Sequence, residues 1–160
     1  PWIASAIVRR VWPDVLELNL REEQPVALWG ETALINTEGE VFEAPISAAE
    51  QALPRMFGPQ GSEAMVQEQY RVFENMLEPV AKSIRELTLS NRGSWTLVTD
   101  DELIIRLGRT EVEPRLARFT RLYQQGLSES LAQAEAIDLR YANGFSVSNK
   151  DTGDTSVASR

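Results

Sequence analysis

The stretch that most constrains the fold of this chain is its last patterned segment, residues 137–148. Apolar and polar residues alternate over residues 137–141 and again from Phe145, which is the period of a strand with one buried face. Asn143-Gly144 lies between the two halves and is favoured in a two-residue type I′ turn, because both turn residues need positive φ. The segment therefore predicts a β-hairpin. Residues 150–160 are nearly all polar or small, so we expect a disordered tail and no further strand.

This predicted hairpin leaves its last strand as the open edge of a sheet. Such an edge carries unpaired backbone N–H and C=O groups and is a template for a strand from another chain. Tyr141 is in phase with Ile137 and Leu139, so the alternation predicts a core position. An amphipathic ring beside Asn143-Gly144 is also typical of an interface anchor, and the pattern leaves both interpretations open.

The rest of the chain alternates between short strand patterns and two helical ones, which predicts an α+β domain. Ser62 is a suitable N-cap for a first helix that ends near Pro79. A second helix begins near Thr110 or Glu113, since Thr110-x-x-Glu113 has the form of a capping box whereas Pro114 favours the first helical position. We expect an antiparallel twisted sheet with both helices on one face. Ahead of the terminal hairpin, strands are predicted at residues 6–12 and 15–22, which form a hairpin of their own, and at 26–29, 33–36, 40–43, 84–90, 94–99 and 102–108.

Two missing amino-acid types narrow the possible chemistry. The absence of cysteine excludes disulfides, thiolate zinc sites and thiol catalysis. The absence of histidine removes the commonest general base and metal ligand, so we expect no metal and no cofactor. The net charge of −8 disfavours nucleic acid and anionic membranes as partners. The apolar runs are too short to cross a bilayer.

Two small clusters keep a hydrolase as an alternative. Asp100 and Asp101 could act as acid and base if their pKa values differed, but neighbouring carboxylates in a turn are usually solvated. Ser148 and Lys150 could form a catalytic dyad only around a buried lysine, and Lys150 opens the polar tail. Catalysis is therefore the weaker interpretation.

Arg115, Arg118 and Arg121 form a stripe at helical spacing on the predicted outer face of the second helix. The ordinary interpretation is a solvated helix face, because exposed charges contribute little to stability. The alternative is a docking surface for an acidic partner.

Ordered motifs along the chain resemble the FtsQ/DivIB family of bacterial cell division proteins, and the proteobacterial branch fits best. The likeness runs from residue 1 to about Val147 with similar spacing, and its strength lies in the number of motifs that occur in order. The motifs are Pro1-Trp2-Ile3, Ile7-Val-Arg9, Trp12-Pro13-x-x-Leu16-x-Leu18, Glu22-x-x-Pro25-Val-Ala-x-Trp29, Leu34-Ile-x-x-x-Gly39-x-x-Phe42, Leu53-Pro54, Gly58-Pro59-x-Gly61-Ser62, Ser94-Trp95, Leu107-Gly108-Arg109, Arg115-Leu-Ala-Arg-Phe119 and Asp138-Leu-Arg-Tyr141-x-x-Gly144.

The resemblance implies a single-pass inner-membrane protein whose periplasmic part holds a POTRA module and a β domain. It implies that residues 1–24 are the end of the POTRA module, lacking its first part and the membrane helix. Residues 25–149 would be the β domain with an open C-terminal edge strand, and residues 150–160 the tail. A POTRA-containing transport or outer-membrane assembly component is the alternative, and it would carry further POTRA repeats.

The family implies a non-enzymatic scaffold at the division septum that links early and late division proteins. It binds FtsB, in complex with FtsL, by adding an FtsB strand to the terminal sheet edge, and its arginines pair with acidic residues of FtsB. Other division proteins are expected to bind through the POTRA module. The contact positions carried over to this sequence, with the strand edge, are Arg92, Arg140, Tyr141, Asn143, Gly144, Phe145, Ser146 and Val147.

Overall fold

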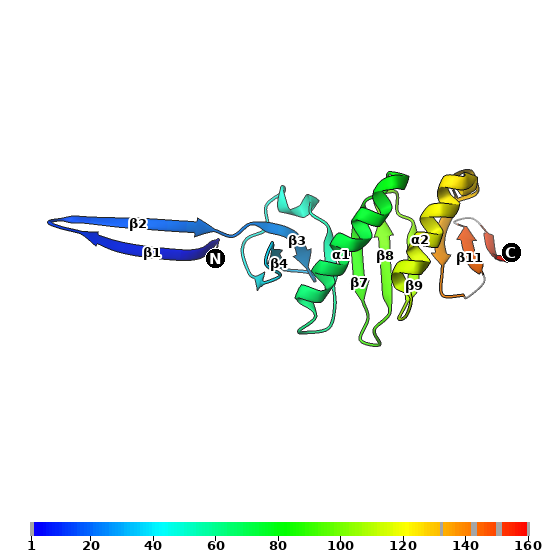
Figure 1. Cartoon of the computed structure of the whole chain (residues 1–160), viewed down its shortest axis with the longest axis horizontal. Coiled ribbons are helices and arrows are strands. Elements are labelled where there is room, and N and C mark those ends of the chain that lie inside the picture. The colour runs from blue at the N-terminus through cyan, green and yellow to red at the C-terminus, as the bar shows by residue number, and fades with distance from the viewer. Residues whose placement is uncertain (1, 132, 142–143, 150–151, 160) are drawn as a thin grey trace.

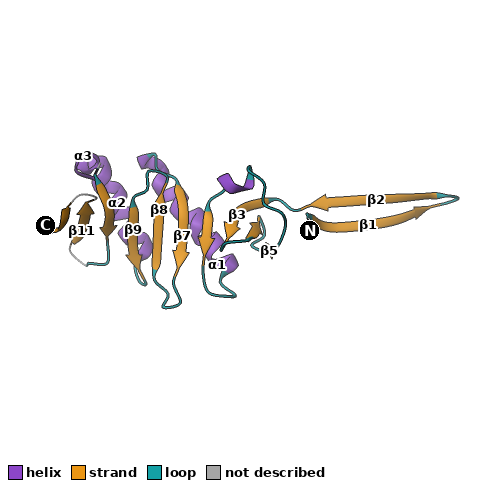
Figure 2. Cartoon of the chain, turned by 180° about the vertical axis from the view of Figure 1, so that it is seen from behind, coloured by secondary structure: helices purple, strands orange, loops and turns teal. Residues whose placement is uncertain are grey.

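The computed structural model of the protein describes residues 2–131, 133–141, 144–149 and 152–159. Its strands form a two-stranded hairpin and a ten-stranded sheet. Figures 1 and 2, seen from opposite sides, place the long helices along one face of that sheet. The α+β class expected from the sequence is therefore confirmed.

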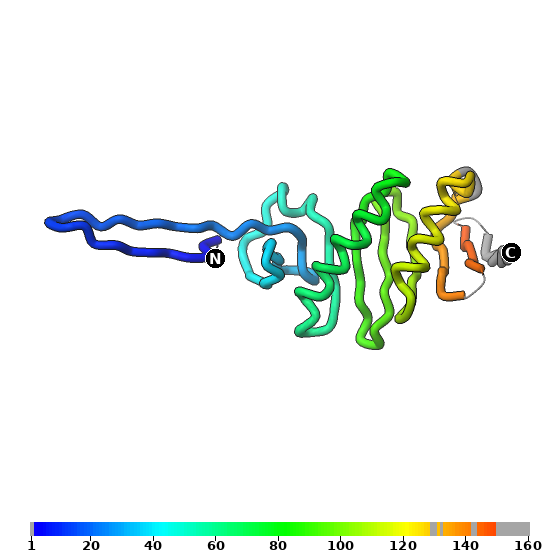
Figure 3. Tube along the Cα trace, in the orientation of Figure 1, coloured from blue at the N-terminus to red at the C-terminus, as the bar shows by residue number. Residues whose placement is uncertain are grey.

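The hairpin of β1 (Ile3–Val11) and β2 (Val15–Glu22) projects from one end of the molecule (Figure 3). Its strands pair antiparallel, and Trp12 at the tip is 80% exposed. The large apolar side chains of both strands are exposed as well. The hairpin thus carries an apolar surface that is open to solvent in the described structure. Its other exposed apolar residues are Ile3, Ile7, Val8, Val11, Val15, Leu16, Leu18 and Leu20.

The ten-stranded sheet is mixed. Its strands are β3 (Pro25–Trp29), β4 (Ala33–Asn36), β5 (Val41–Phe42), β6 (Arg55–Phe57), β7 (Ile84–Leu89), β8 (Trp95–Thr99), β9 (Ile104–Gly108), β10 (Ala134–Asp138), β11 (Gly144–Asn149) and β12 (Thr152–Ser159). They lie in the order β12-β11-β10-β9-β8-β7-β6-β3-β4-β5. The pairs β3–β6, β6–β7 and β9–β10 are parallel, so the expectation of an antiparallel sheet is wrong there. Helical crossovers after β6 and β9 return the chain to the same end of the sheet, which makes the next strand parallel.

Helices α1 (Glu63–Leu77) and α2 (Val112–Leu122) lie side by side on one face of the sheet, as predicted. The α2 helix begins after Glu111, whose φ of +53° turns the chain into the helix. It therefore starts between the two predicted positions, Thr110 and Glu113. Shorter helical segments are η1 (Glu50–Ala52), η2 (Glu78–Val80), η3 (Tyr123–Leu127) and α3 (Ser128–Leu131). Within the described ranges, no helix combines the length and the apolar character needed to cross a bilayer.

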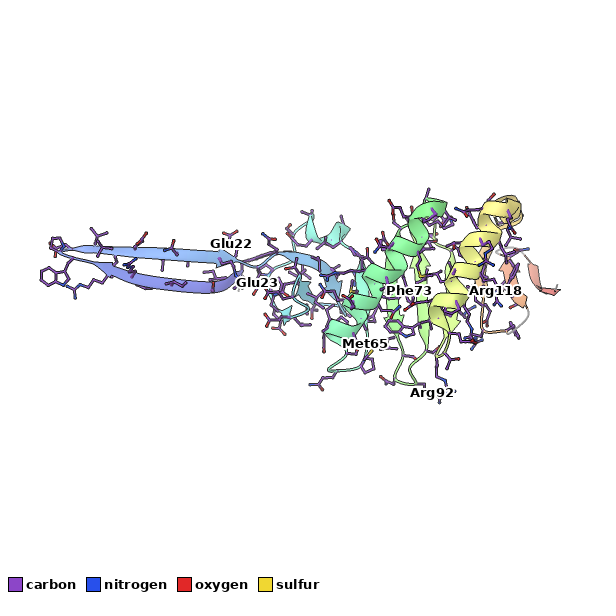
Figure 4. All side chains as sticks on the ribbon, viewed as in Figure 1. Glu22, Glu23, Met65, Phe73, Arg92 and Arg118 are labelled. Carbon is purple, nitrogen blue, oxygen red and sulfur yellow. The ribbon has the colours of Figure 1, made fainter. Side chains whose placement is uncertain are left out.

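The core lies between the sheet and the two long helices. Phe73 and Leu77 of α1 are fully buried, as are Leu116 and, at 1% exposure, Phe119 of α2. The Phe73 ring meets Trp95 of β8 edge to face, with ring centroids 5.9 Å apart. Figure 4 shows Phe73 on α1. These contacts join both helices to the central strands and hold that end of the sheet where the predicted site lies.

The β12 strand corrects the expected C-terminal edge. The sequence predicts a disordered tail here, but residues 152–159 pair antiparallel with β11, from Gly144↔Ser159 to Asn149↔Thr152. Pairing needs only backbone N–H and C=O groups, so a polar sequence can complete the ladder that an exposed strand edge leaves unfinished. The terminal edge of the described sheet is therefore that of β12, and a strand of the same chain covers the outer edge of β11.

Glu74 provides a test of charge burial near the end of α1. Burial raises the pKa of its carboxyl, the hydrogen bond from the Ile84 backbone N–H (2.9 Å) opposes this, and the charge of Asp100 adds to it; the net pKa is raised. Because the pKa of Glu74 is raised in the folded state, this carboxyl contributes stability that is fully present below its ordinary, unfolded-state pKa. That stability is lost as pH rises through the folded-state pKa.

We expect Glu74→Gln to raise the free energy of unfolding at pH 7 by up to about 0.5 kcal/mol. The glutamine carbonyl can still accept the Ile84 N–H, while the partly buried charge is gone. Urea unfolding of both proteins between pH 4 and pH 8 measures the effect, and the difference should grow with pH. A difference that is the same at every pH would contradict this account.

Candidate functional site

The residues predicted to bind a partner gather at one end of the sheet. Arg92 lies in the turn between β7 and β8, Arg140 and Tyr141 follow β10, and Gly144 begins β11. Figure 4 shows Arg92 at the tip of its turn. Arg92 and Arg140 line one pocket of about 490 Å³, so the fold brings together two residues that are distant in the sequence. The other lining residues are Ser94, Gly108, Arg109, Thr110 and Arg115.

This pocket is a positive region on a chain whose net charge is −8. Four of its lining residues are arginines. Arg140 is ion-paired with Asp138, and Arg115 lies 4.0 Å from the carboxylate of Glu111, whose side chain is mostly exposed. Guanidinium groups recognise carboxylates through paired hydrogen bonds. The pocket therefore suits a ligand that carries carboxylates.

Asp138 holds the Arg140 side chain in place. The Arg140 Nε lies 2.8 and 2.9 Å from the two carboxylate oxygens, and the Arg140 backbone N–H donates to the same group (3.0 Å). Partial burial alone would raise the pKa of Asp138, but the hydrogen bonds and charge of Arg140 outweigh it and keep that pKa below its ordinary value. The Arg140 side chain is still 56% exposed, so the pair presents an oriented guanidinium to solvent.

Gly108 ends β9 where two arginine side chains converge. Its φ is +81°, which favours glycine, and a Cβ there would lie 2.9 Å from Arg115 Nη1 and 3.0 Å from Arg140 Cγ. Arg115 in turn donates to the Leu107 carbonyl (2.6 Å). The missing side chain of Gly108 thus lets Arg115 and Arg140 share the wall of the pocket.

Tyr141 is 53% exposed, so the core position that alternation predicts is wrong. The reason is that β10 ends at Asp138, and the strand period no longer applies beyond it. Leu139 is still buried, and its N–H continues the parallel pairing by donating to the Arg106 carbonyl (2.9 Å). Tyr141 instead lines a small surface pocket of about 120 Å³, together with Glu111, Pro114, Arg115 and Arg118.

The β11 residues differ in what they can offer a partner. Phe145 and Ser146 are buried, while Gly144 and Val147 are half-buried. The Phe145 ring belongs to the core, so contact along this strand would be made mainly by the backbone. Asn143 lies outside the described residues. The predicted two-residue turn is replaced by a longer connection, because β10 ends at Asp138 and β11 begins at Gly144.

The predicted arginine stripe on α2 is not a uniformly solvated face. Arg121 is exposed, but Arg115 and Arg118 are half-buried and donate to backbone carbonyls. The sequence analysis also missed the structural roles of Asp138, which orients Arg140, and of Gly108, which leaves room for Arg115 and Arg140. The Asp-x-Arg spacing was the available signal for the first, and the glycine directly after an alternating strand was the signal for the second.

The residues of the hydrolase alternative make structural contacts. Asp101 is ion-paired with Lys82, whose side chain is only 6% exposed, and it also accepts the Thr99 hydroxyl. Asp100 accepts the backbone N–H of Ser83 (3.3 Å). Ser148 lies half-buried in β11, and its proposed partner Lys150 falls outside the described residues. No group of metal-binding side chains occurs in the part of the chain that the structure describes.

Comparison with known proteins shows the family of the chain. A family model described as cell division protein FtsQ/DivIB, C-terminal, matches residues 27–140. Cell division protein FtsQ of Coxiella burnetii is 35% identical over 94% of this chain and 62% of the relative, and that of Neisseria gonorrhoeae is 38% identical over 96% and 62%. FtsQ of Escherichia coli strain K12 is 35% identical over 92% of this chain and 55% of its own length. The chain thus spans less than two thirds of these relatives. It belongs to the FtsQ/DivIB family of cell division proteins.

Proposed function

We propose that the chain is a non-enzymatic scaffold of the division machinery that binds FtsB, in complex with FtsL, by β-strand addition at its C-terminal sheet edge. The observation that carries the proposal is the grouping of Arg92, Arg140 and exposed Tyr141 beside the start of β11. An oriented set of side chains next to a strand edge is the arrangement that strand-addition partners use, with the backbone giving affinity and flanking side chains giving selectivity.

The backbone of β11 is the proposed template. The Phe145 and Ser146 side chains are buried, so a partner would pair with main-chain groups. We propose that the partner strand takes the place of β12, because the β12 sequence Thr-Gly-Asp-Thr-Ser-Val-Ala-Ser is a poor strand former. An FtsB strand of higher β propensity would then displace β12 and pair with β11.

Selectivity would come from the arginine pocket. Arg140 is oriented by Asp138 and keeps more than half of its side chain in solvent, and Arg92 reaches the same pocket from the β7–β8 turn. Acidic residues of FtsB would supply the carboxylates that these guanidinium groups bind. Tyr141 would give an apolar anchor with a polar tip beside them.

The exposed apolar hairpin of β1 and β2 supports a division of the chain into two domains. We propose that residues 1–24 are the end of a POTRA module whose remaining part covers the apolar residues of β1 and β2. Residues 25–149 would be the β domain. In line with its family, the chain would act at the division septum from the periplasm, attached to the inner membrane by a helix outside these residues.

The decisive experiment compares the full chain with a chain that ends after Asn149. Isothermal titration calorimetry with the periplasmic segment of FtsB should detect binding to both. We expect the shortened chain to bind about two- to tenfold more tightly, because no internal strand competes for β11.

The two chains also separate the alternatives. Loss of binding on shortening would mean that the partner pairs with β12 and not with β11. Absence of binding to both chains, with circular dichroism spectra of folded protein, would overturn the proposed partner.

A further inference from the structure

Among the described residues, Arg118 is the arginine of the α2 stripe that bonds to the connection between β10 and β11. Its Nη2 donates to the carbonyls of Leu139 (3.3 Å), Tyr141 (3.1 Å) and Gly144 (3.2 Å). The side chain is half-buried on α2, and Figure 4 shows it over the C-terminal part of the sheet. A single guanidinium nitrogen therefore lies among three carbonyls of one connection.

Three carbonyls that meet around one donor hold Leu139, Tyr141 and Gly144 in place relative to one another. Leu139 is buried, so its carbonyl would lose a partner that water cannot easily replace. The Tyr141 and Gly144 carbonyls lie on either side of the connection. By binding all three, Arg118 sets where the Tyr141 ring emerges and where β11 begins.

We propose that Arg118 is a positioning residue for the partner-binding edge, an inference that rests on the proposed function. Arg118 acts on the backbone of the connection, whereas Asp138 acts on the Arg140 side chain. Binding then costs less ordering, because the anchor residue and the strand start are already in place before the partner arrives. The resemblance to known family motifs assigns the contacts to Arg140 and Tyr141, and the geometry assigns the backbone support of Tyr141 to Arg118.

The test uses the full chain with Arg118→Gln, and Arg71→Gln as the matched control. Arg71 on α1 also donates from Nη2 to a backbone carbonyl, that of Thr37 (2.9 Å), so the control removes the same charge and the same kind of bond elsewhere. We expect Arg118→Gln to weaken binding of the periplasmic FtsB segment by about tenfold. The control should bind within about twofold of wild type.

Hydrogen exchange of the free protein gives a readout that does not depend on the partner. Backbone amides of residues 139–141 and 144–147 should exchange faster in Arg118→Gln, with the urea midpoint of the whole domain little changed. Failure of the wild-type protein to bind FtsB would overturn the proposed function. The exchange measurement would still decide whether Arg118 orders the connection. Unchanged exchange together with unchanged affinity would overturn the inference.

Arg118→Lys provides a second variant should the glutamine variant not fold. It keeps the charge, but its side chain is one atom shorter, so the ammonium does not reach the position that Nη2 holds among the three carbonyls. We expect a folded protein with an affinity between those of wild type and Arg118→Gln. Full wild-type affinity and exchange in Arg118→Lys would count against the three-carbonyl geometry.

Discussion

Replacing Phe73 by alanine is expected to lower the free energy of unfolding by about 3–5 kcal/mol, the range typical of a large aromatic side chain lost from a core. Phe73 lies on α1 and is fully buried, and its ring packs edge to face on Trp95. The alanine would leave a cavity between helix and sheet and would also remove the aromatic pair. Urea unfolding followed by circular dichroism measures the loss.

Met65 supplies the control on the same helix. It is 60% exposed, so Met65→Ala should change the free energy of unfolding by no more than about 0.5 kcal/mol. The dependence of the unfolding free energy on urea concentration should be the same in both variants, since the surface exposed on unfolding is similar. A Phe73→Ala protein as stable as Met65→Ala would contradict the position of the core described above.

Replacing Tyr141 by alanine is expected to weaken FtsB binding by about thirtyfold, which corresponds to about 2 kcal/mol and is typical of an aromatic anchor. The ring is 53% exposed beside the arginine pocket, so its removal takes away contact area without opening the core. The folded state should be almost as stable as wild type. Titration calorimetry with the periplasmic FtsB segment measures the affinity.

Met65→Ala again provides the comparison, because Met65 is an exposed apolar residue on α1, on the far side of α2 from the strand edge (Figure 4). It should bind FtsB like wild type. Equal affinities for wild type and Tyr141→Ala would leave Tyr141 without a part in the interface, even if the edge itself is the binding site.

These two experiments address different levels of the molecule. Phe73 tests whether the helices and the central strands form one packed unit, and Tyr141 tests what that unit presents at its end. The pocket around Gly108 depends on both, because Arg115 comes from α2 and Arg140 from the end of β10. Loss of the core would therefore also disperse the arginines.

Much of the local structure could be predicted from the sequence. The helical periodicity of residues 63–77 corresponds closely to α1. The alternation in residues 15–22 and 33–36 corresponds closely to β2 and β4. Periodicity works there because each element buries one face, so burial and backbone geometry favour the same pattern. The resemblance in ordered motifs also gave the family, which the comparisons confirm.

Tyr141 and β12 mark where periodicity stops being informative. The alternating pattern continues past Asp138, but β10 ends there and β11 begins only at Gly144. The polar residues of β12 carry no strand signal, and the backbone edge of β11 is what pairs with them. Both outcomes depend on which strands lie next to each other in the sheet, and local composition does not specify those neighbours.

The sequence by itself determined most of the elements (neither β6 nor β12), the α+β class, the family and the residue types available for chemistry. Only the tertiary structure decided that β9 and β10 run parallel, that Arg92 and Arg140 share a pocket, and that Arg118 holds three carbonyls. Local patterns depend on which face of an element is buried. Contacts between distant residues depend on the order and direction of the strands, and these are set only when the whole sheet is assembled.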